Sequence, residues 1–265
     1  LAEDAPLSLL VMDPLSKPLA CDCVLGYAQR DYAPLAKLIE RRTGRRVELV
    51  YHTSLVAAVK AREGEAFDLI VGKQSVVRHD AKAIEQAVAP WAMLRDRTGS
   101  THLHGLLVVR ADDPAKTTAD LKGRAILFGL ESSAEKHAAG LALLVREGVT
   151  PPKRIRMADS CADAALDVLD EKADAAVISS YAQPLLVGCG TIPADSLRVV
   201  GHTAPVPFVT VFYDKALDEE LVEAVGGALE RVADDAALRQ ALETRGFVRF
   251  DGAGDASAGD GLASA

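Results

Sequence analysis

The four cysteines of this 265-residue chain, Cys21, Cys23, Cys161 and Cys189, are the residues whose types and spacing bear most directly on chemistry. Cys21 and Cys23 form a Cys-Asp-Cys motif after the first predicted strand, and Cys161 follows Ser160 at the start of a predicted helix. Thiolates are soft ligands that select soft acceptors such as Cu(I), Zn(II) or trivalent arsenic. A fold that brought Cys21, Cys23 and Cys161 together would therefore bind a soft metal or metalloid.

The cysteines have two other interpretations. An even number of cysteines in an exported protein is typical of structural disulfides, and four cysteines allow three pairings that the sequence does not decide. Inert free thiols are the third alternative. No metal-binding spacing is recognisable among the six histidines, which are His52, His79, His102, His104, His137 and His202.

Hydroxyl side chains stand where predicted strands lead into predicted helices. Ser132 and Ser133 lie in the segment GLESSAEKHAAG, and Thr53 and Ser54 follow a predicted strand. A helix N-terminus offers free N–H groups and a partial positive charge, so these positions suit a small oxyanion. They suit plain helix caps as well, since Ser132 and Glu135 have the spacing of a capping box. Both interpretations stay open.

Strand-like and amphipathic runs alternate from the first residues onward, which is typical of α/β proteins with largely parallel sheets. The opening run predicts a strand over 7–12, a helix over 31–42 and a strand over 47–51. Further strands are predicted at 67–71, 102–110, 154–160, 173–179 and 206–214, and further helices at 54–63, 132–148, 162–171, 219–234 and 236–244. Strands 102–110 and 206–214 are candidates for a hinge, because two crossing strands would join two lobes.

Composition excludes several classes of function. The chain is 49% hydrophobic and 26% charged, which indicates ordinary globular cores. A formal net charge of -8 argues against non-specific binding of nucleic acid. No apolar run approaches the roughly 18–20 residues that span a bilayer. The chain starts at Leu1 rather than Met, which permits removal of a signal peptide and hence export.

The motifs of common enzymes are absent from the sequence. It contains no GxSxG, HExxH, GxxxxGK[ST] or GxGxxG pattern, which would mark a nucleophile, a metal site or a phosphate loop. We therefore predict no catalysis and no cofactor, apart from the ion that the cysteines would hold.

Four phrases, in their order and spacing, resemble one family. They are DYAPLAKLIERRTGRRVELV, AREGEAFDLIVG, VVRADDPAKTTADLKGRAILFGLESSAEKHAAG and ALDVLDEKADAAVISS, and they cover roughly residues 30–215. The chain resembles the phosphate, phosphite and phosphonate group of ABC-importer binding proteins, which are type 2 periplasmic binding proteins. The resemblance implies two Rossmann-like α/β lobes joined by a two-strand hinge, a ligand in the cleft between them and a membrane permease as partner.

The resemblance also assigns site residues. The family places an aromatic side chain, here Tyr27, against the ligand, and its loop at Ser132 and Ser133 touches the ligand. The position of Cys161 is commonly a histidine that lines the cleft, so Cys21, Cys23 and Cys161 would meet there. Ser160 beside it, together with Ser179 and Tyr181 at the end of a strand, is expected to line the same cleft.

The sequence departs from the family in this loop. Ala134 and Glu135 stand where the family has serine and glycine, and an added carboxylate would oppose an anionic ligand. This departure argues against phosphonate as the specific ligand.

We predict an exported or periplasmic solute-binding monomer with lobe 1 at 1–104 plus 207–250, lobe 2 at 105–206 and a disordered tail at 251–265. It captures a small oxyanion, namely phosphate, phosphite or a phosphonate, by hinge closure for an ABC importer. The alternative is a soft metal or metalloid (Cu, Zn or arsenite) on Cys21, Cys23 and Cys161, for transport or for sensing with a histidine kinase. No nucleic-acid partner is expected.

Overall fold

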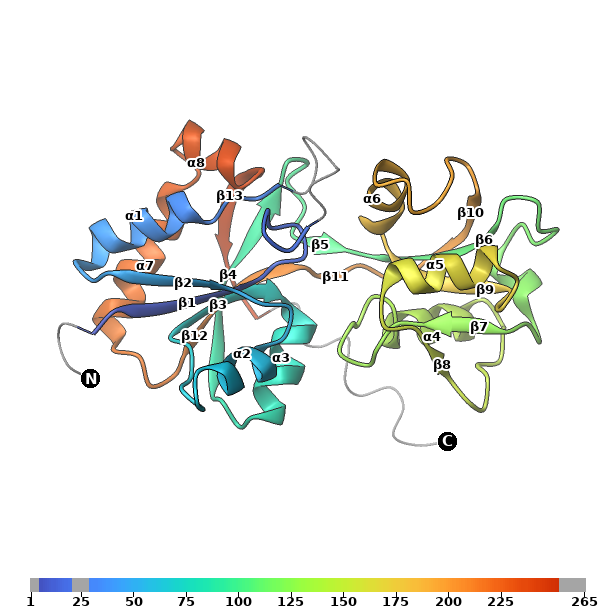
Figure 1. The fold of residues 1–265 in the computed structure, drawn as a ribbon, viewed down its shortest axis with the longest axis horizontal. Coiled ribbons are helices and arrows are strands. Elements are labelled where there is room, and N and C mark those ends of the chain that lie inside the picture. The colour runs from blue at the N-terminus through green and yellow to red at the C-terminus, as the bar shows by residue number, and fades with distance from the viewer. Residues whose placement is uncertain (1–4, 21–28, 253–265) are drawn as a thin grey trace. The chain divides into compact units, whose positions relative to one another are not determined.

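The computed structural model describes residues 5–20 and 29–252, which divide into two compact units. Unit 1 contains the described residues up to Thr101 and those from Pro207 onward, and unit 2 is His102–Val206. The blue and red ends of the colour scale therefore both belong to unit 1 (Figure 1). Cys21, Cys23 and Tyr27, and the tail from residue 253, lie outside the described residues. Among the residues described, no helix is both long and apolar enough to cross a membrane.

In the described part of unit 1, six strands form one mixed sheet in the order β13-β4-β12-β3-β1-β2. The strand β1 (Leu7–Met12) runs parallel to β2 (Val47–Tyr51) and β3 (Leu69–Lys73). The strand β12 (Val209–Asp214) runs antiparallel to β3 and to β4 (Val88–Asp96), and β13 (Thr244–Arg249) runs antiparallel to β4.

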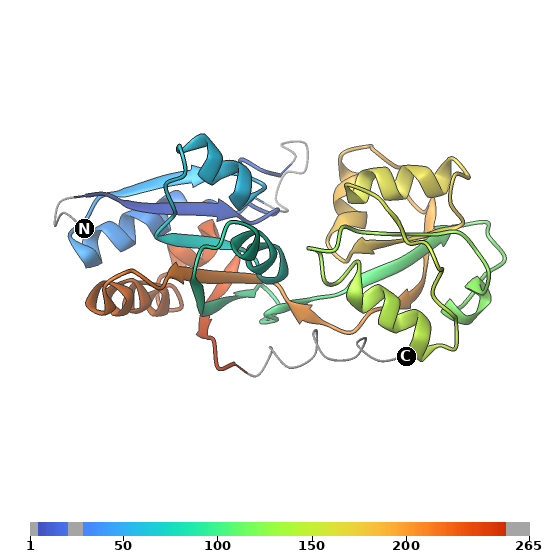
Figure 2. The ribbon, with the colours of Figure 1, turned by 90° about the horizontal axis from the view of Figure 1, so that it is seen from below.

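Helices cover both faces of this sheet (Figures 1 and 2). The helices α2 (Leu55–Ala61) and α3 (Gln74–Ala83) share a core with Leu10 and Met12 of β1. Side chains alternate along a strand, so the neighbouring residues of β1 point to the opposite face. That face is covered by α1 (Ala33–Thr43) and α7 (Glu219–Arg231), which contact each other, with α8 (Ala236–Ala241) beside them.

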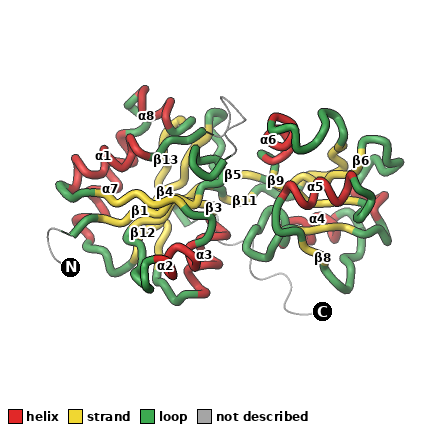
Figure 3. The backbone as a smooth tube through the Cα atoms, viewed as in Figure 1, coloured by secondary structure: helices red, strands yellow, loops and turns green. Residues whose placement is uncertain are grey.

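Unit 2 has a five-stranded sheet in the order β10-β6-β9-β7-β8. Figure 3 draws the strands of both units in yellow. Its strands are β10 (Leu197–His202), β6 (Gly105–Arg110), β9 (Ala175–Ser179), β7 (Ile126–Phe128) and β8 (Arg156–Met157). The short strands β5 (His102–Leu103) and β11 (Val206–Pro207) pair with each other where the chain passes between the units. A 3-10 helix, η1 (Thr118–Leu121), precedes β7.

Successive side chains of a strand point to opposite faces of the sheet, and in unit 2 each face packs in its own core. Leu106 and Val108 of β6 pack in one core with α5 (Cys161–Leu169) and α6 (Ala182–Gly188). Leu107 and Val109 of the same strand pack in the other core with α4 (Ala138–Arg146). Both faces of the strand are apolar and buried, as expected for a sheet that helices cover on both sides.

The predicted α/β class is confirmed, but the expectation of largely parallel sheets is wrong. The pairs β12–β3 and β6–β9 are antiparallel. The reason is topological: β6 and β12 are the strands by which the chain enters unit 2 and returns to unit 1, and each begins at the sheet edge where the parallel strands end.

Gly226 tests how tightly α7 packs on the sheet. A Cβ at Gly226 would lie 1.9 Å from Cζ2 of the buried Trp91, whereas a Cβ at the adjacent Gly227 meets nothing within 4 Å. We expect Gly226→Ala to lower the free energy of unfolding by about 1–3 kcal/mol through overpacking. Gly227→Ala is the matched control and is expected to raise it by about 0.5–1 kcal/mol, because alanine favours the helix. Urea denaturation measures both, and equal effects would contradict the packing.

Candidate ligand-binding site

The parallel strands of each unit end at one edge of its sheet, and the sequence-predicted site residues follow those ends. In unit 2, β7 runs parallel to both β8 and β9, so the three strands end at the same edge. Ligands of open α/β sheets bind outside such carboxyl ends. The residues of unit 2 that the structure places there are Ser132, Ser133, Ser160, Cys161, Ser179 and Tyr181.

The segment between β7 and α4 is a loop closed on itself, which we call the 129–137 loop. The backbone N–H of Gly129 donates to Lys136 O at 3.3 Å, and Ser133 N donates to Leu130 O at 2.9 Å. His137 Nδ1 lies 2.8 Å from Gly129 O and must be the donor, because a carbonyl oxygen only accepts. These bonds fix the loop against the end of β7.

The helix predicted from residue 132 begins instead at Ala138, so the proposed capping box of Ser132 and Glu135 is wrong. His137 precedes the first turn, and no side chain caps this helix. The physical reason is that the Glu135 carboxylate has another partner, since Ser179 Oγ donates to Glu135 Oε1 at 2.6 Å. The hydrogen bond between Ser179 and Glu135, which are 44 residues apart in the chain, therefore replaces the local capping interaction.

Glu135, Ser179 and Cys161 form a buried chain of contacts in unit 2. Glu135 and Ser179 are fully buried, and Cys161 Sγ lies 3.7 Å from Ser179 Oγ and accepts from Ser179 N at 3.4 Å. The carboxylate that was expected to oppose an anionic ligand is thus held inside unit 2 by a serine. The Ser179 hydroxyl is committed to that carboxylate.

Two other serines use their hydroxyls in helix caps. Ser160 Oγ donates to Asp163 Oδ2 at 2.7 Å and accepts from Asp163 N, which caps α5. In unit 1, Ser54 caps α2, and its Oγ donates to Asp80 Oδ2 at 3.0 Å. Both hydroxyls bind carboxylates of their own unit, which favours the cap interpretation at these two positions.

Ser132, Ser133 and Thr53 differ from these serines. Within residues 5–20 and 29–252, none of the three hydroxyls makes a hydrogen bond. Ser133 is buried, Ser132 is half-buried and Thr53 is exposed at the end of β2. Tyr181, which precedes α6, packs against the α5 core of unit 2. The predicted serine and threonine contacts thus fall into two groups. Some have hydroxyls that donate to carboxylates of their own unit, and the others have hydroxyls without a hydrogen bond in the described residues.

The corresponding edge of unit 1 is built on a buried ion pair. Asp13 follows β1, and its carboxylate accepts from Arg30 at 3.0 Å, from Tyr32 OH at 2.7 Å and from Leu15 N at 2.9 Å. Asp13, Arg30 and Tyr32 are all at most 3% exposed. Burial, with the Asp13 carboxylate second, raises the pKa of Tyr32 well above its ordinary value, so Tyr32 stays a donor.

Aromatic packing extends this network across the edge. The Arg30 guanidinium lies 5.7 Å from the ring centroid of Phe208, and Phe208 O accepts from Gln74 N at the start of α3. The ion pair therefore ties the loop after β1 to the beginning of α3 and to the segment that leads into β12. Sequence reasoning missed this network, because its members are 17 to 19 residues apart in an apolar context.

Removal of the Asp13 charge tests the network. Asp13→Asn keeps the shape but leaves the Arg30 charge buried without a counter-ion, and we expect a loss of about 3–5 kcal/mol of unfolding free energy. The control is Glu48→Gln, because Glu48 pairs with Arg62 at 2.9 Å while 49% exposed, and such pairs contribute at most about 1 kcal/mol. Thermal unfolding compares the variants. A loss in Asp13→Asn no larger than in the control would contradict a structural role.

Histidines that sequence reasoning set aside also lie at the edge of unit 2. The ring centroids of His104, before β6, and His202, at the end of β10, are 5.2 Å apart. Burial, with His202 second, lowers the pKa of His104 below its ordinary value. Protonation of His104 is therefore disfavoured, so this ring contributes little positive charge at the edge.

The cysteines that the structure describes are free thiols. Cys161 and Cys189 are both partly buried and are not bonded to each other. Among the described residues, no group of three histidine, cysteine or acidic side chains is placed to hold a metal ion. Cys21 and Cys23, the other members of the proposed thiolate site, lie outside the described residues.

The thiol state is directly measurable. We expect alkylation of the protein, denatured without reductant, to label at least Cys161 and Cys189, because neither is in a disulfide. Intact mass spectrometry counts the labels, and peptide mapping identifies them. A fully reduced sample gives the four-label reference. A protein with no labelled cysteine would contradict the structure.

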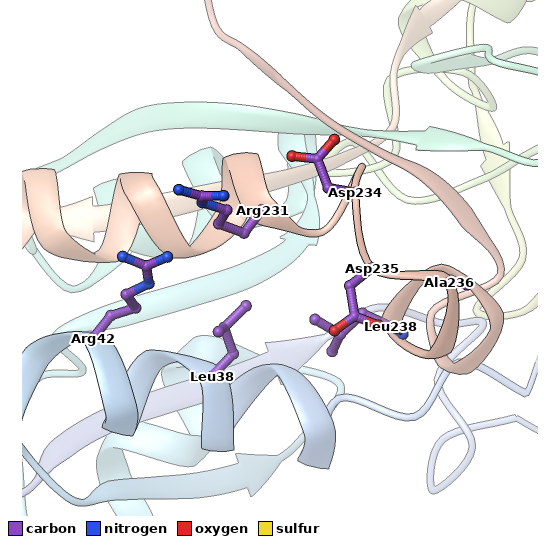
Figure 4. Close-up of a pocket in the computed structure, with 7 residues that line it drawn as sticks. All are labelled: Leu38, Arg42, Arg231, Asp234, Asp235, Ala236 and Leu238. Carbon is purple, nitrogen blue, oxygen red and sulfur yellow. Dashed lines mark hydrogen bonds between the residues drawn. The ribbon is translucent and has the colours of Figure 1, made fainter.

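A hollow of about 420 Å³ lies elsewhere on unit 1, among α1, α7 and α8 (Figure 4). Figure 4 shows the guanidinium groups of Arg42 and Arg231 on one side and Asp234 and Asp235 on the other. The arginines stand in the last turns of α1 and α7, where cations complement the helix dipole, and Asp235 caps α8. Helix ends account for these charges, so we assign the hollow no ligand.

The folding pattern of the two units is that of type 2 periplasmic binding proteins. A Xanthomonas citri protein bound to ATP superposes with a TM-score of 0.68 at 19% identity, covering 94% of this chain and 92% of that chain. A binding-protein component of an ABC phosphonate transporter from Pseudomonas aeruginosa gives a TM-score of 0.68 at 15% identity, covering 93% and 82%. PhnD1 from Prochlorococcus marinus, in complex with methylphosphonate, gives 0.66 at 14% identity, covering 92% of each chain.

The sequence itself identifies the family. Residues 27–257 match the family described as the periplasmic substrate-binding protein of phosphonate ABC transporters. The chain belongs to this family, whose members are substrate-binding components of transporters, and the predicted resemblance is confirmed. Among curated proteins, no relative matches the chain.

Proposed function

We propose that this protein is an exported binding component that captures a small phosphorus oxyanion (phosphate, phosphite or a phosphonate) and delivers it to an ABC permease. Family membership supports the class of protein. Two of the similar structures hold ATP and methylphosphonate, ligands that share a tetrahedral phosphorus group with charged oxygens. The proposal accordingly concerns that shared group and leaves the remainder of the ligand open.

The observation that carries the proposal is which of the hydroxyl groups at the sheet edges make hydrogen bonds within their own unit and which do not. Ser54, Ser160 and Ser179 donate to carboxylates of their own units. Ser132 and Ser133 make no side-chain hydrogen bond within the described residues, and they lie in the loop that leads into α4. Hydroxyl donors next to a helix N-terminus suit an oxyanion. We propose Ser132 and Ser133 as ligand contacts of unit 2.

The proposed contacts from unit 1 are Thr53, whose hydroxyl is exposed and makes no hydrogen bond in the described part, and Tyr27. We propose that the ligand is held between the two units and that closure brings these contacts onto it. A ligand that touches both units binds the closed form better and shifts the population toward it. The protein does no chemistry on its ligand in this proposal, and the permease is the partner that reads the closed form.

The thiolate alternative gains no support from the described residues. Within the described residues, the Cys161 thiol contacts Ser179, and no group of metal-binding side chains is found in that part of the chain. We therefore advance the oxyanion as the single proposed ligand class.

Titration calorimetry with phosphate, phosphite and methylphosphonate tests the proposal. We expect Ser133→Ala and Ser132→Ala each to weaken binding about 10-fold or more, since a hydrogen bond to a charged group contributes about 1.5–3 kcal/mol. Ser196→Ala is the control, because Ser196 bonds Pro193 O just before β10 begins, at the opposite end of that strand from His202. Its affinity is expected to stay unchanged. A wild-type protein that binds none of the three anions would overturn the proposal.

A further inference from the structure

The 129–137 loop contains a largely buried cation, Lys136. The residue is only 8% exposed. Within the described residues its ammonium makes no ion pair, in contrast to the buried Arg30, which pairs with Asp13. The adjacent carboxylate of Glu135 is bound by Ser179. The charge of Lys136 is therefore not neutralised by a direct partner in its own unit.

Gly129 makes room for the stem of this lysine. A Cβ at Gly129 would lie 2.6 Å from Cβ, 2.7 Å from Cε and 3.1 Å from Cδ of Lys136. The stem therefore lies directly against the backbone at the end of β7, and any other residue at position 129 would displace it. The bond from Gly129 N to Lys136 O holds the same two residues together.

Enclosing an ammonium without a counter-ion is costly, because protein surroundings replace part of its hydration. A ligand anion would offset that cost. The ammonium nitrogen is not among the fully buried polar atoms that lack a hydrogen bond in the described part of the chain. Since it makes no hydrogen bond there, the nitrogen keeps some exposed surface, while the apolar stem stays buried, as in other amphipathic side chains.

Several features around Lys136 favour the same ligand charge. Lys136 lies two residues before α4, a nine-residue helix whose N-terminus carries a partial positive charge and has no side-chain cap. Ser132 and Ser133 stand in the same loop with hydroxyls that make no hydrogen bond in the described part. One loop, between the end of β7 and the start of α4, thus contains a cation and two hydroxyl donors.

We propose that Lys136 is the cationic anchor of the bound phosphorus oxyanion. This inference rests on the proposed function, since it names the residue that neutralises the ligand. The ammonium pairs with one charged oxygen, while Ser132 and Ser133 donate to the others. The lysine supplies a positive charge in the loop that also contains the carboxylate of Glu135.

Calorimetry with methylphosphonate and with inorganic phosphate, at pH 8 and at two salt concentrations, tests the anchor. We expect Lys136→Gln to weaken binding about 10- to 100-fold and to reduce the salt dependence of the affinity, because an ionic hydrogen bond is lost. Lys136→Arg keeps the charge and is expected to recover part of the affinity. The control is Lys153→Gln, an exposed lysine of unit 2, for which no change is expected.

The outcomes separate the two proposals. If the wild type binds the anions and Lys136→Gln binds them equally well while Ser133→Ala does not, the anchor is wrong and the proposed function stands. If the wild type binds neither anion, both are wrong. Equal weakening by Lys136→Gln and Lys136→Arg would also overturn the anchor, since it would indicate a role in packing rather than in charge. Circular dichroism melts confirm that each variant is folded.

Discussion

The hydrogen bond from Ser179 to the buried Glu135 is the contact on which the proposed ligand edge of unit 2 depends. It joins the end of β9 to the 129–137 loop, and a buried carboxylate that lost its donor would be strongly destabilising. With Glu135 held inward, the loop that contains Ser133 and Lys136 is constrained as well. The geometry of the edge thus follows from a charged group that is itself inaccessible to a ligand.

In unit 1, buried carboxylates also hold the loops at the sheet edge by accepting hydrogen bonds. The Asp13 carboxylate accepts from Arg30, Tyr32 and a backbone amide, and this holds the loop after β1. Asp80 binds the Ser54 hydroxyl and the Leu55 amide, and this holds the loop after β2. In both units, therefore, the hydrogen-bond donors that stabilise these loops are bonded to buried carboxylates of the same unit. Donors without such a partner are the ones that we propose for recognition of an anion.

The local sequence pattern was sufficient to predict the fold class and those helices and strands that bury one or both of their faces. The apolar runs at β1 and β9 and the amphipathic run at α1 were predictable because their burial repeats with the period of the element. The strands β4 and β13 were not, since Pro90 interrupts one and Gly246, with a φ of 110°, sits at a register shift in the other.

At the candidate site, too, the features that depend on neighbouring residues were predictable, whereas those that depend on residues distant in sequence were not. Ser132 and Ser133 were predictable as edge residues from their position between a strand and a helix. Their cap interpretation failed because the partner of Glu135 is distant in sequence. Lys136 was overlooked because a helix from residue 132 would treat it as an ordinary surface lysine. Only the closed loop reveals that its stem is enclosed.

The interrupted sequence of unit 1 has a consequence for the order of assembly. The strand β12 lies between β3 and β4 in the sheet, yet it is synthesised only after all of unit 2. Until then β3 and β4 each have an edge without its final neighbour, while unit 2 is continuous and can complete its own sheet. Pairings over such long sequence separations are slow to form. A nascent chain would therefore finish its second unit before its first.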